Sequence, residues 1–165
     1  MTHAHPLSRR SLMASAFALG GLVPLAALAG AESPAGSTWK RLTDAEWRRR
    51  LAPESYAVLR HEATETPFSS PLNREHRKGT FACIGCALPL FRSTWKFDSG
   101  TGWPSFYDAI PGALTKKADF AIGIPRTEYH CARCLGHQGH VFDDGPAPTH
   151  LRYCNNGVGL TFAAA

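Results

Sequence analysis

Four of the five cysteines in this chain come in two C-x-x-C pairs, the residue pattern with the clearest capacity for chemistry. Cys83 and Cys86 form one pair, and Cys131 and Cys134 form the other. Each pair can present two thiolates from one tight turn, and two such turns supply the four sulfur ligands that tetrahedral Zn²⁺ prefers. Because protein fills all four positions, we expect one structural zinc ion per chain, which joins two distant segments of a small domain.

Two other uses of these four cysteines remain open. Two structural disulfides would suit a protein of an oxidising compartment. A redox-active pair of the thioredoxin type needs a strand–helix–strand context, which the sequence does not suggest. The doubled motif, with 44 residues between its halves, favours zinc.

Cys154 is left without a partner once the other four cysteines bind a metal. A lone cysteine is often only a small buried apolar residue. Its neighbours favour chemistry, because Arg152 and Asn156 lie two positions before and after it and would share its face on a strand. A nearby cation lowers the pKa of a thiol and increases the amount of thiolate, which is the nucleophile.

Two histidines three positions apart, His137 and His140, precede this cysteine, and Asp144 follows them. A histidine side chain titrates near neutral pH and can deliver a proton to a reacting group. The same histidines extend the second cysteine pair into a string that resembles a metal-ligand motif. Four cysteines already complete a tetrahedron, so we expect the histidines to act in catalysis.

The segment DSGTGWPSFYDAI contains two aromatic residues beside a turn, Trp103 and Phe106. Such rings usually belong to the core. Beside a nucleophile they could instead form the apolar wall of a pocket for a small aliphatic group.

Two short helices are predicted at the start of the domain that must position these residues. Thr43 and Glu46 have the spacing of a capping box, and Pro53 ends the first helix and suits the first turn of the second. Tyr56 and Leu59 are three positions apart, so they can share a buried face.

Short β-prone segments follow from Gly79 onward, separated by Gly, Pro, Asp and Asn. These segments are TFACI, STWKF, DFAIGI, TEYHC, HVFDD, HLRYC and VGLTF. No alternation of strands and helices is present, which argues against a parallel sheet. We therefore expect a mainly β, antiparallel domain with helices at its N-terminal end.

The N-terminal segment differs in character from the rest. Arg9 and Arg10 precede an almost uncharged apolar run, so residues 1–31 resemble a twin-arginine signal peptide that is cleaved after export. Residues 32–38 read as a linker and residues 39–165 as the domain. An uncleaved membrane anchor is the alternative. The expected location is periplasmic or secreted.

The charge of the chain gives no sign of a nucleic-acid partner. Its formal net charge is +5, and the basic triplet Arg48–Arg50 is too short for a binding patch and fits a solvated helix face. We expect contact with a membrane only through the signal segment, and a monomer.

Three segments together resemble the B-type methionine sulfoxide reductases: SGTGWPSFYDAI, RTEYHCARCLGHQGHVFDDGPAPT and LRYCNN. The similarity covers about residues 40–163. It implies two small antiparallel sheets of the Mss4-like kind with a four-cysteine zinc site. The implied reaction is thiol-dependent reduction of the R epimer of methionine sulfoxide, in oxidised proteins or as the free amino acid.

The resemblance also implies roles for individual residues. Cys154 matches the nucleophile, and His140 matches the group that helps to protonate the sulfoxide oxygen. Trp103 matches the aromatic residue that holds the S-methyl group. The polar residues that orient substrate and catalyst are His137, Asn156, Arg152 and Asp144.

The sequence departs from this family at three positions. Many relatives carry a recycling cysteine where this chain has Thr101, so we expect a sulfenic acid on Cys154 to be reduced directly by a small thiol or a thioredoxin-like donor. Gly157 replaces a common serine and could loosen the wall beside Asn156. Gln138 replaces a common leucine.

Two competing functions would use the same residues differently. A non-enzymatic zinc-ribbon binding module would need only the four paired cysteines. A metal-dependent hydrolase would use His137 and His140 and would survive alkylation of thiols.

Overall fold

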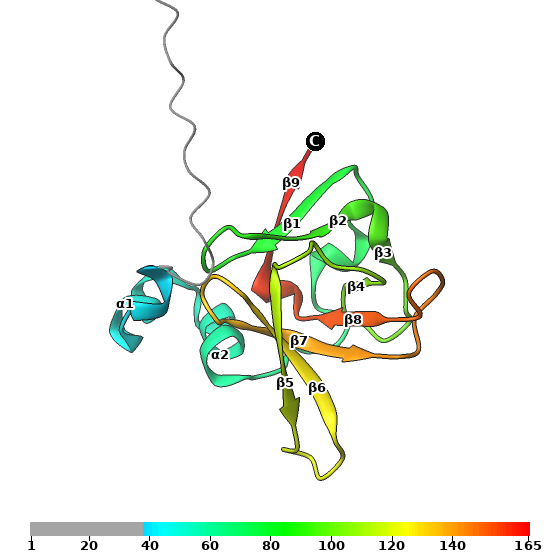
Figure 1. The fold of residues 1–165 in the computed structure, drawn as a ribbon. Coiled ribbons are helices and arrows are strands. Elements are labelled where there is room, and N and C mark those ends of the chain that lie inside the picture. Colours follow the sequence, from blue (N-terminus) through cyan, green and yellow to red (C-terminus); the bar gives the residue numbers. More distant parts are fainter. Residues whose placement is uncertain (1–37) are drawn as a thin grey trace, which may run out of the picture. The chain divides into compact units, whose positions relative to one another are not determined.

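The computed structural model describes residues 38–165, so the predicted signal peptide and nearly all of the predicted linker lie outside the described residues. Helices α1 (Asp44–Arg50) and α2 (Pro53–His61) precede the strands, which form two antiparallel sheets (Figure 1). The prediction of a mainly β domain with short N-terminal helices is confirmed. No helix within the described range is long and apolar enough to span a bilayer.

The described residues contain strands β1 (Gly79–Cys83), β2 (Pro89–Arg92), β3 (Lys96–Phe97), β4 (Ser105–Phe106), β5 (Leu114–Asp119), β6 (Arg126–Cys131), β7 (His137–Phe142), β8 (Arg152–Asn155) and β9 (Leu160–Ala164). Short 3₁₀ helices are η2 (Thr38–Arg41), η3 (Pro71–Arg74), η4 (Ser93–Trp95) and η5 (Gly157–Gly159).

Both helices begin as their sequences predict. The side chain of Thr43 accepts from the backbone N–H of Glu46, whose carboxylate accepts in return from the Thr43 N–H at 2.7 Å. Pro53 opens α2. Tyr56 and Leu59 are both buried, so α2 packs one apolar face against the domain.

The two sheets have the strand orders β2-β1-β9 and β3-β4-β8-β7-β6-β5. Three aromatic rings join them in the core: Phe106 stacks on Phe91 with ring centroids 4.2 Å apart and meets Phe81 edge-to-face at 5.0 Å. Strand β8 belongs to the larger sheet and continues through η5 into β9 of the smaller one. One continuous segment therefore links both sheets.

Strand pairing sets Cys154 beside two residues from distant parts of the chain. It lies opposite Ser105 of β4 and opposite His140 of β7. Directly paired residues point to the same face of an antiparallel sheet, with Cβ atoms about 5 Å apart. The sheet register therefore places the thiol next to the imidazole.

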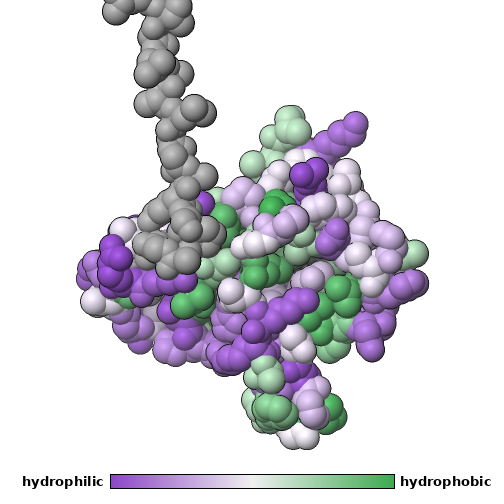
Figure 2. All heavy atoms as spheres, viewed as in Figure 1, coloured by the Kyte–Doolittle hydropathy of each residue, from purple (hydrophilic) through white to green (hydrophobic). Residues whose placement is uncertain are grey.

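The prediction of a strand at DFAIGI is wrong. The chain instead forms β5 before it, pairs Asp119 with Arg126, and turns between them. Gly123 has φ +77° and donates its N–H to the carbonyl of Phe120 at 3.0 Å, so the segment is a hairpin tip. The alternation of Phe120, Ile122 and Ile124 resembles a half-buried strand, but these side chains point into solvent at the tip, where Figure 2 shows hydrophobic atoms.

Candidate active site and candidate metal centre

The four paired cysteines form one buried cluster, with all four sulfur atoms within 4.8 Å of one another. Cys83 Sγ lies 3.6 Å from Cys134 Sγ, and Cys86 Sγ lies 3.4 Å from Cys131 Sγ. A tetrahedral zinc site with bonds of about 2.3 Å requires sulfur separations of roughly 3.8 Å. The sulfur separations are much longer than a disulfide bond of about 2.05 Å, and four sulfur donors this close together could hold a structural metal ion, consistent with zinc.

The two turns that carry these cysteines have the same geometry. Ala87 and Leu135 follow the pairs with φ near +58°, and each donates its N–H at 2.8 Å to the first cysteine's carbonyl. Cys83 ends β1 of the smaller sheet and Cys131 ends β6 of the larger. The cluster therefore joins the two sheets.

Two further donors suit thiolate ligands. The side-chain Nε2 of Gln138 and the backbone N–H of Gly136 approach Cys83 Sγ and Cys134 Sγ, both at 3.4 Å. A hydrogen bond to sulfur stabilises a negative charge on it. Gln138 is completely buried, so its amide cannot turn to water, and its nitrogen points to the cysteine cluster.

Cys154 faces a second feature, a cavity of about 120 Å³. Its walls include Thr64, Trp103, Arg126, His140, Phe142, Cys154 and Asn156. The cavity therefore combines one thiol, one imidazole and one indole ring, all from residues that the sequence singled out.

The Cys154 thiol is half-buried, and burial raises its pKa above the ordinary value. The Thr101 hydroxyl, 3.9 Å from the sulfur, and the nearby Arg152 guanidinium act in the opposite direction. The expectation that a neighbouring cation gives this thiol a low pKa is corrected, because desolvation outweighs both contacts.

His140 is held by an acid that the sequence reasoning missed. Its Nε2 lies 2.8 Å from Oδ2 of Asp119, and the same carboxylate oxygen lies 2.5 Å from a nitrogen of Arg126. The backbone N–H of Ala121, which donates to this carboxylate, holds the pKa of Asp119 far below its usual range, and the contacts with His140 and Arg126 act in the same direction. Asp119 and Arg126 bracket the hairpin tip, and no spacing rule linked them to His140.

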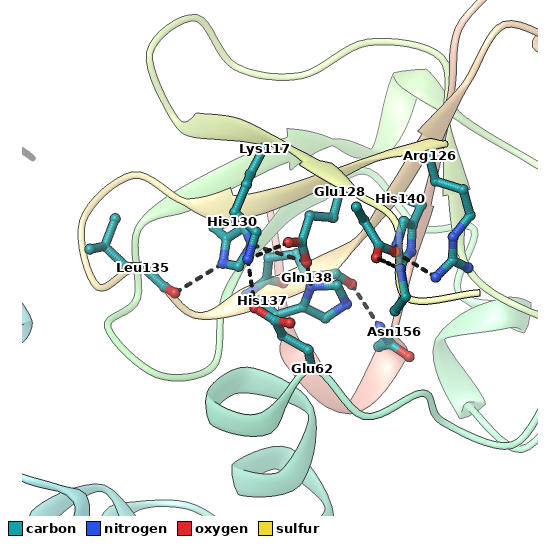
Figure 3. A network of polar contacts seen from close by, with 12 residues as sticks. Glu62, Lys117, Arg126, Glu128, His130, Leu135, His137, Gln138, His140 and Asn156 are labelled. Atoms are coloured by element: carbon teal, nitrogen blue, oxygen red, sulfur yellow. Dashed lines mark hydrogen bonds and ion pairs between the residues drawn. The ribbon is translucent and has the colours of Figure 1, made fainter. Parts of the chain in front are cut away.

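His137 does not line the cavity but lies behind His140, with ring centroids 5.5 Å apart. It is buried, and its Nδ1 lies 3.0 Å from Oε2 of Glu128, which also pairs with Lys117 (Figure 3). Desolvation, helped by His130, lowers the pKa of His137 to about 4, so the ring is neutral at neutral pH. Its ring therefore packs against that of His140 and stays outside the cavity.

A loop after α2 holds the other side of the cavity, and its anchor, Glu65, was also missed. The Glu65 carbonyl accepts from the Trp103 indole at 2.9 Å, and its N–H donates to Oδ1 of Asn156 at 2.9 Å. Its carboxylate accepts from the Gly157 N–H at 2.5 Å. Asn156 also donates to the carbonyl of Gln138 at 3.0 Å, so its amide is used to fix the wall.

Arg152 and Asp144 form a bidentate pair, with both contacts at 2.8 Å, and neither lines the cavity. The contribution that the structure shows for Arg152 is that its guanidinium lowers the pKa of the Cys154 thiol. The prediction of Phe106 as a substrate contact is corrected, because its ring is fully buried against Phe91 and Phe81.

A family model described as the SelR domain matches residues 51–164. The chain belongs to this family.

Curated relatives named peptide methionine sulfoxide reductase MsrB match 71 to 76% of this chain. One from Pseudomonas putida (strain W619) is 55% identical over 118 residues, which cover 71% of this chain and 89% of the relative. One from Thiobacillus denitrificans (strain ATCC 25259 / T1) is 50% identical over 127 residues, 76% of this chain and 96% of the relative. Among solved structures, the Mis18 Yippee-like domain is similar at 16% identity and a TM-score of 0.44, covering 54% of this chain and 98% of the domain.

The structure explains why this chain carries glycine, and no larger residue, at position 157. A Cβ atom there would lie 1.9 Å from Oγ of Ser70. Ser70 therefore occupies the space of a side chain at 157, and the wall beside Asn156 is filled. The expectation that Gly157 loosens this wall is corrected.

Proposed function

We propose that this SelR-family chain reduces methionine sulfoxide to methionine, with Cys154 as nucleophile and the R epimer as substrate. One observation carries the proposal: the Cys154 thiol opens on a small cavity that it shares with His140 and Trp103. The family match supports the reaction class.

The chemical step transfers one oxygen atom. The Cys154 thiolate attacks the sulfoxide sulfur, and proton delivery from the His140 side makes the oxygen a better leaving group. The attack forms an S–S bond while the S–O bond breaks and the oxygen leaves as water. Water then attacks the Cys154 sulfur, the S–S bond breaks, methionine leaves, and Cys154 carries the oxygen as a sulfenic acid. Cysteine sulfur is oxidised and methionine sulfur is reduced by two electrons.

The same walls would distinguish the epimers. A sulfoxide sulfur carries a methyl group, an oxygen and the side-chain methylene as three different substituents. The Trp103 ring offers an apolar surface for the methyl group, and His140 lies toward the oxygen. Once these two positions are assigned, only one epimer presents its sulfur to Cys154.

Recycling needs thiols from outside the chain. One external thiol forms a mixed disulfide with the Cys154 sulfenic acid and releases water, and a second thiol frees the enzyme. The other four cysteines are buried in the metal-type cluster. Zinc bound there would supply structure, because four protein ligands leave no open position.

The proposed setting is the repair of oxidised proteins, or of free methionine sulfoxide, outside the cytoplasm. The twin-arginine-like segment with Arg9 and Arg10 supports export. We propose a monomer that uses a small thiol or a thioredoxin-like donor.

One assay tests the proposal. Purified protein is incubated with dithiothreitol and each epimer of dabsyl-methionine sulfoxide, and methionine formation is followed by chromatography. We expect turnover of the R epimer, lost in Cys154→Ser, with folding checked by circular dichroism. Equal turnover of both epimers would refute the epimer assignment, and turnover by Cys154→Ser would refute the nucleophile. Inactivity towards both epimers, with intact zinc binding, would instead favour a zinc-ribbon binding module.

A further inference from the structure

A second group of metal-ligand side chains lies on the larger sheet, apart from the four cysteines. Glu128 and His130 lie two positions apart on β6, and His137 begins the neighbouring strand β7. One ligand atom from each residue lies within 4.8 Å of the other two. Glu128 and His137 are buried, and the His130 side chain is only 14% exposed (Figure 3). Two strands therefore bring three ligand-type side chains together below the surface.

The distances in this group suit a bound metal ion. Nδ1 of His137 and Nε2 of His130 lie 3.0 and 3.3 Å from the same atom, Oε2 of Glu128. Bonds of about 2.0 to 2.1 Å from nitrogen and oxygen to a tetrahedral ion place two ligand atoms roughly 3.4 Å apart. Small side-chain adjustments are therefore enough for the three atoms to share one ion.

One nitrogen of His130 has no hydrogen-bond partner. Its Nδ1 lies 3.2 Å from the carbonyl oxygen of Leu135, which can only accept, so the ring proton belongs on Nδ1. Nε2 then presents a lone pair, and it is buried without a hydrogen bond within residues 38–165, although Oε2 of Glu128 lies 3.3 Å away. A proton shared by these two atoms would lie close to the line between them, whereas a metal ion bound to both lies off that line. The contact therefore favours a metal ion over a shared proton.

The surrounding groups resemble the outer shell of a metal site. Metal-bound histidines usually donate their other ring N–H to a carbonyl or carboxylate, as His130 does to Leu135. Lys117 Nζ lies 2.6 Å from Oε1 of Glu128, which leaves Oε2 for an ion. Lys117 also pairs with Glu62 at 3.0 Å. Two carboxylates therefore face one ammonium group, and the remaining negative charge favours a cation.

We propose that Glu128, His130 and His137 bind a divalent transition-metal ion at a site separate from the four cysteines. Zinc sites with three protein ligands include the set of two histidines and one carboxylate, and imidazole also suits copper and nickel. Three protein ligands leave a position for water, so this ion should exchange more readily than one held by four cysteines. The site is independent of the reaction at Cys154.

Calorimetry with Zn²⁺ tests this site. Full-length Cys154→Ser protein, which lacks the free thiol as a competing ligand, is saturated with zinc and freed of loosely bound ion by gel filtration. It is then titrated with Zn²⁺. We expect about one further ion per chain to bind. Addition of His130→Gln should weaken this binding at least 10- to 100-fold, because loss of even an outer-shell group costs roughly that much.

Two more variants separate the site from general effects of substitution. His76→Gln is the matched control, because His76 is exposed and belongs to neither metal-ligand group, and it should leave the affinity unchanged. Glu128→Gln keeps the size of the side chain but removes its charge, and it should also weaken binding. Circular dichroism checks the fold of each variant, and one folded ligand variant is enough for the comparison.

Co²⁺ titrated in the same way identifies the ligand type. We expect visible absorption bands without the near-ultraviolet charge-transfer band of a cobalt–thiolate bond. The thiolate band would assign the second ion to the cysteines and overturn the site. Equal Zn²⁺ affinity with and without His130→Gln, or no second ion at all, would overturn it as well. Each of these results would leave the proposed reductase function intact, because none of them measures turnover.

Discussion

The imidazole of His140 is joined to the carboxylate of Asp119 across 2.8 Å, between Nε2 and Oδ2. The contact connects β7, which faces Cys154, to the last residue of β5. A carboxylate in this position fixes the orientation of the ring and the nitrogen that shares a proton with it. Proton delivery to a sulfoxide should therefore depend on a residue that does not touch the substrate.

Replacement of this carboxylate is predicted to slow turnover. Asp119→Asn should lower kcat roughly 10- to 100-fold, the usual cost of losing the group that orients a functional histidine, with a small effect on KM. Steady-state kinetics with N-acetylmethionine-R-sulfoxide measures both. Asp108→Asn is the matched control, because the contact of Asp108 is with the N–H of Ala109. Full kcat in Asp119→Asn would show that the contact is only structural. A pH–rate profile that changes shape would support a role in proton transfer.

The buried environment of Cys154 predicts a thiol that reacts slowly at neutral pH. Because its pKa is raised, the thiolate fraction should be smaller than in free cysteine and should increase as the pH rises through that pKa. The pH of half-maximal alkylation by iodoacetamide should lie above that of N-acetylcysteine measured in parallel. Arg152→Gln should shift this pH of half-maximal alkylation higher still, since the Arg152 guanidinium lowers the pKa of the Cys154 thiol. A midpoint below that of N-acetylcysteine would contradict the dominance of burial.

Thr101 is close enough to the nucleophile for a cysteine there to act as an internal reductant. Its hydroxyl oxygen lies 3.9 Å from Cys154 Sγ, and loop adjustment can bring two sulfur atoms to about 2.05 Å. Thr101→Cys, treated with substrate in the absence of thiols, should form an intramolecular disulfide with loss of two hydrogens by mass spectrometry. The unaltered protein and Thr101→Ser should instead give a sulfenic acid that dimedone traps. A disulfide from Cys154 to any of the four clustered cysteines in the unaltered protein would refute this account of recycling.

Gln138 is predicted to slow the loss of zinc from the cysteine cluster. Zinc should be present at about one ion per chain by elemental analysis, and its removal should lower the melting temperature, because metal binding and folding are coupled. Gln138→Leu removes the donor to Cys83 Sγ and should release zinc several-fold faster to a chromogenic chelator. Gln138→Glu is the matched control of similar size, with no amide donor. Equal release rates in all three proteins would show that the N–H···S contact has no effect on the metal.

The sequence predicts those parts of this protein that depend on local spacing. A C-x-x-C pair fixes its own turn, and Thr43 with Glu46 fixes a helix start, so both appear in the structure as expected. The contact of Asp119 with His140 spans 21 residues, and that of Glu65 with Trp103 spans 38. Such contacts depend on how strands pair and loops pack, which no local pattern encodes.

Two aromatic residues in one short segment illustrate the same limit. Trp103 lines the cavity and Phe106 lies in the core, although only three positions separate them. Trp103 precedes β4, whereas Phe106 belongs to it. The alternation of side chains along a strand therefore does not extend to Trp103. The sequence alone could not show which of the two rings lines the cavity and which lies in the core.

The ion pair between Asp119 and Arg126 also closes the base of the hairpin tip. The six residues between them can therefore change in composition while the two ends stay joined and His140 keeps its carboxylate. The base of the hairpin holds the carboxylate that orients His140, while its tip carries exposed apolar side chains that take no part in this contact. A loop of different composition grafted between these two residues should therefore leave the carboxylate of His140 in place and the candidate catalytic centre unchanged.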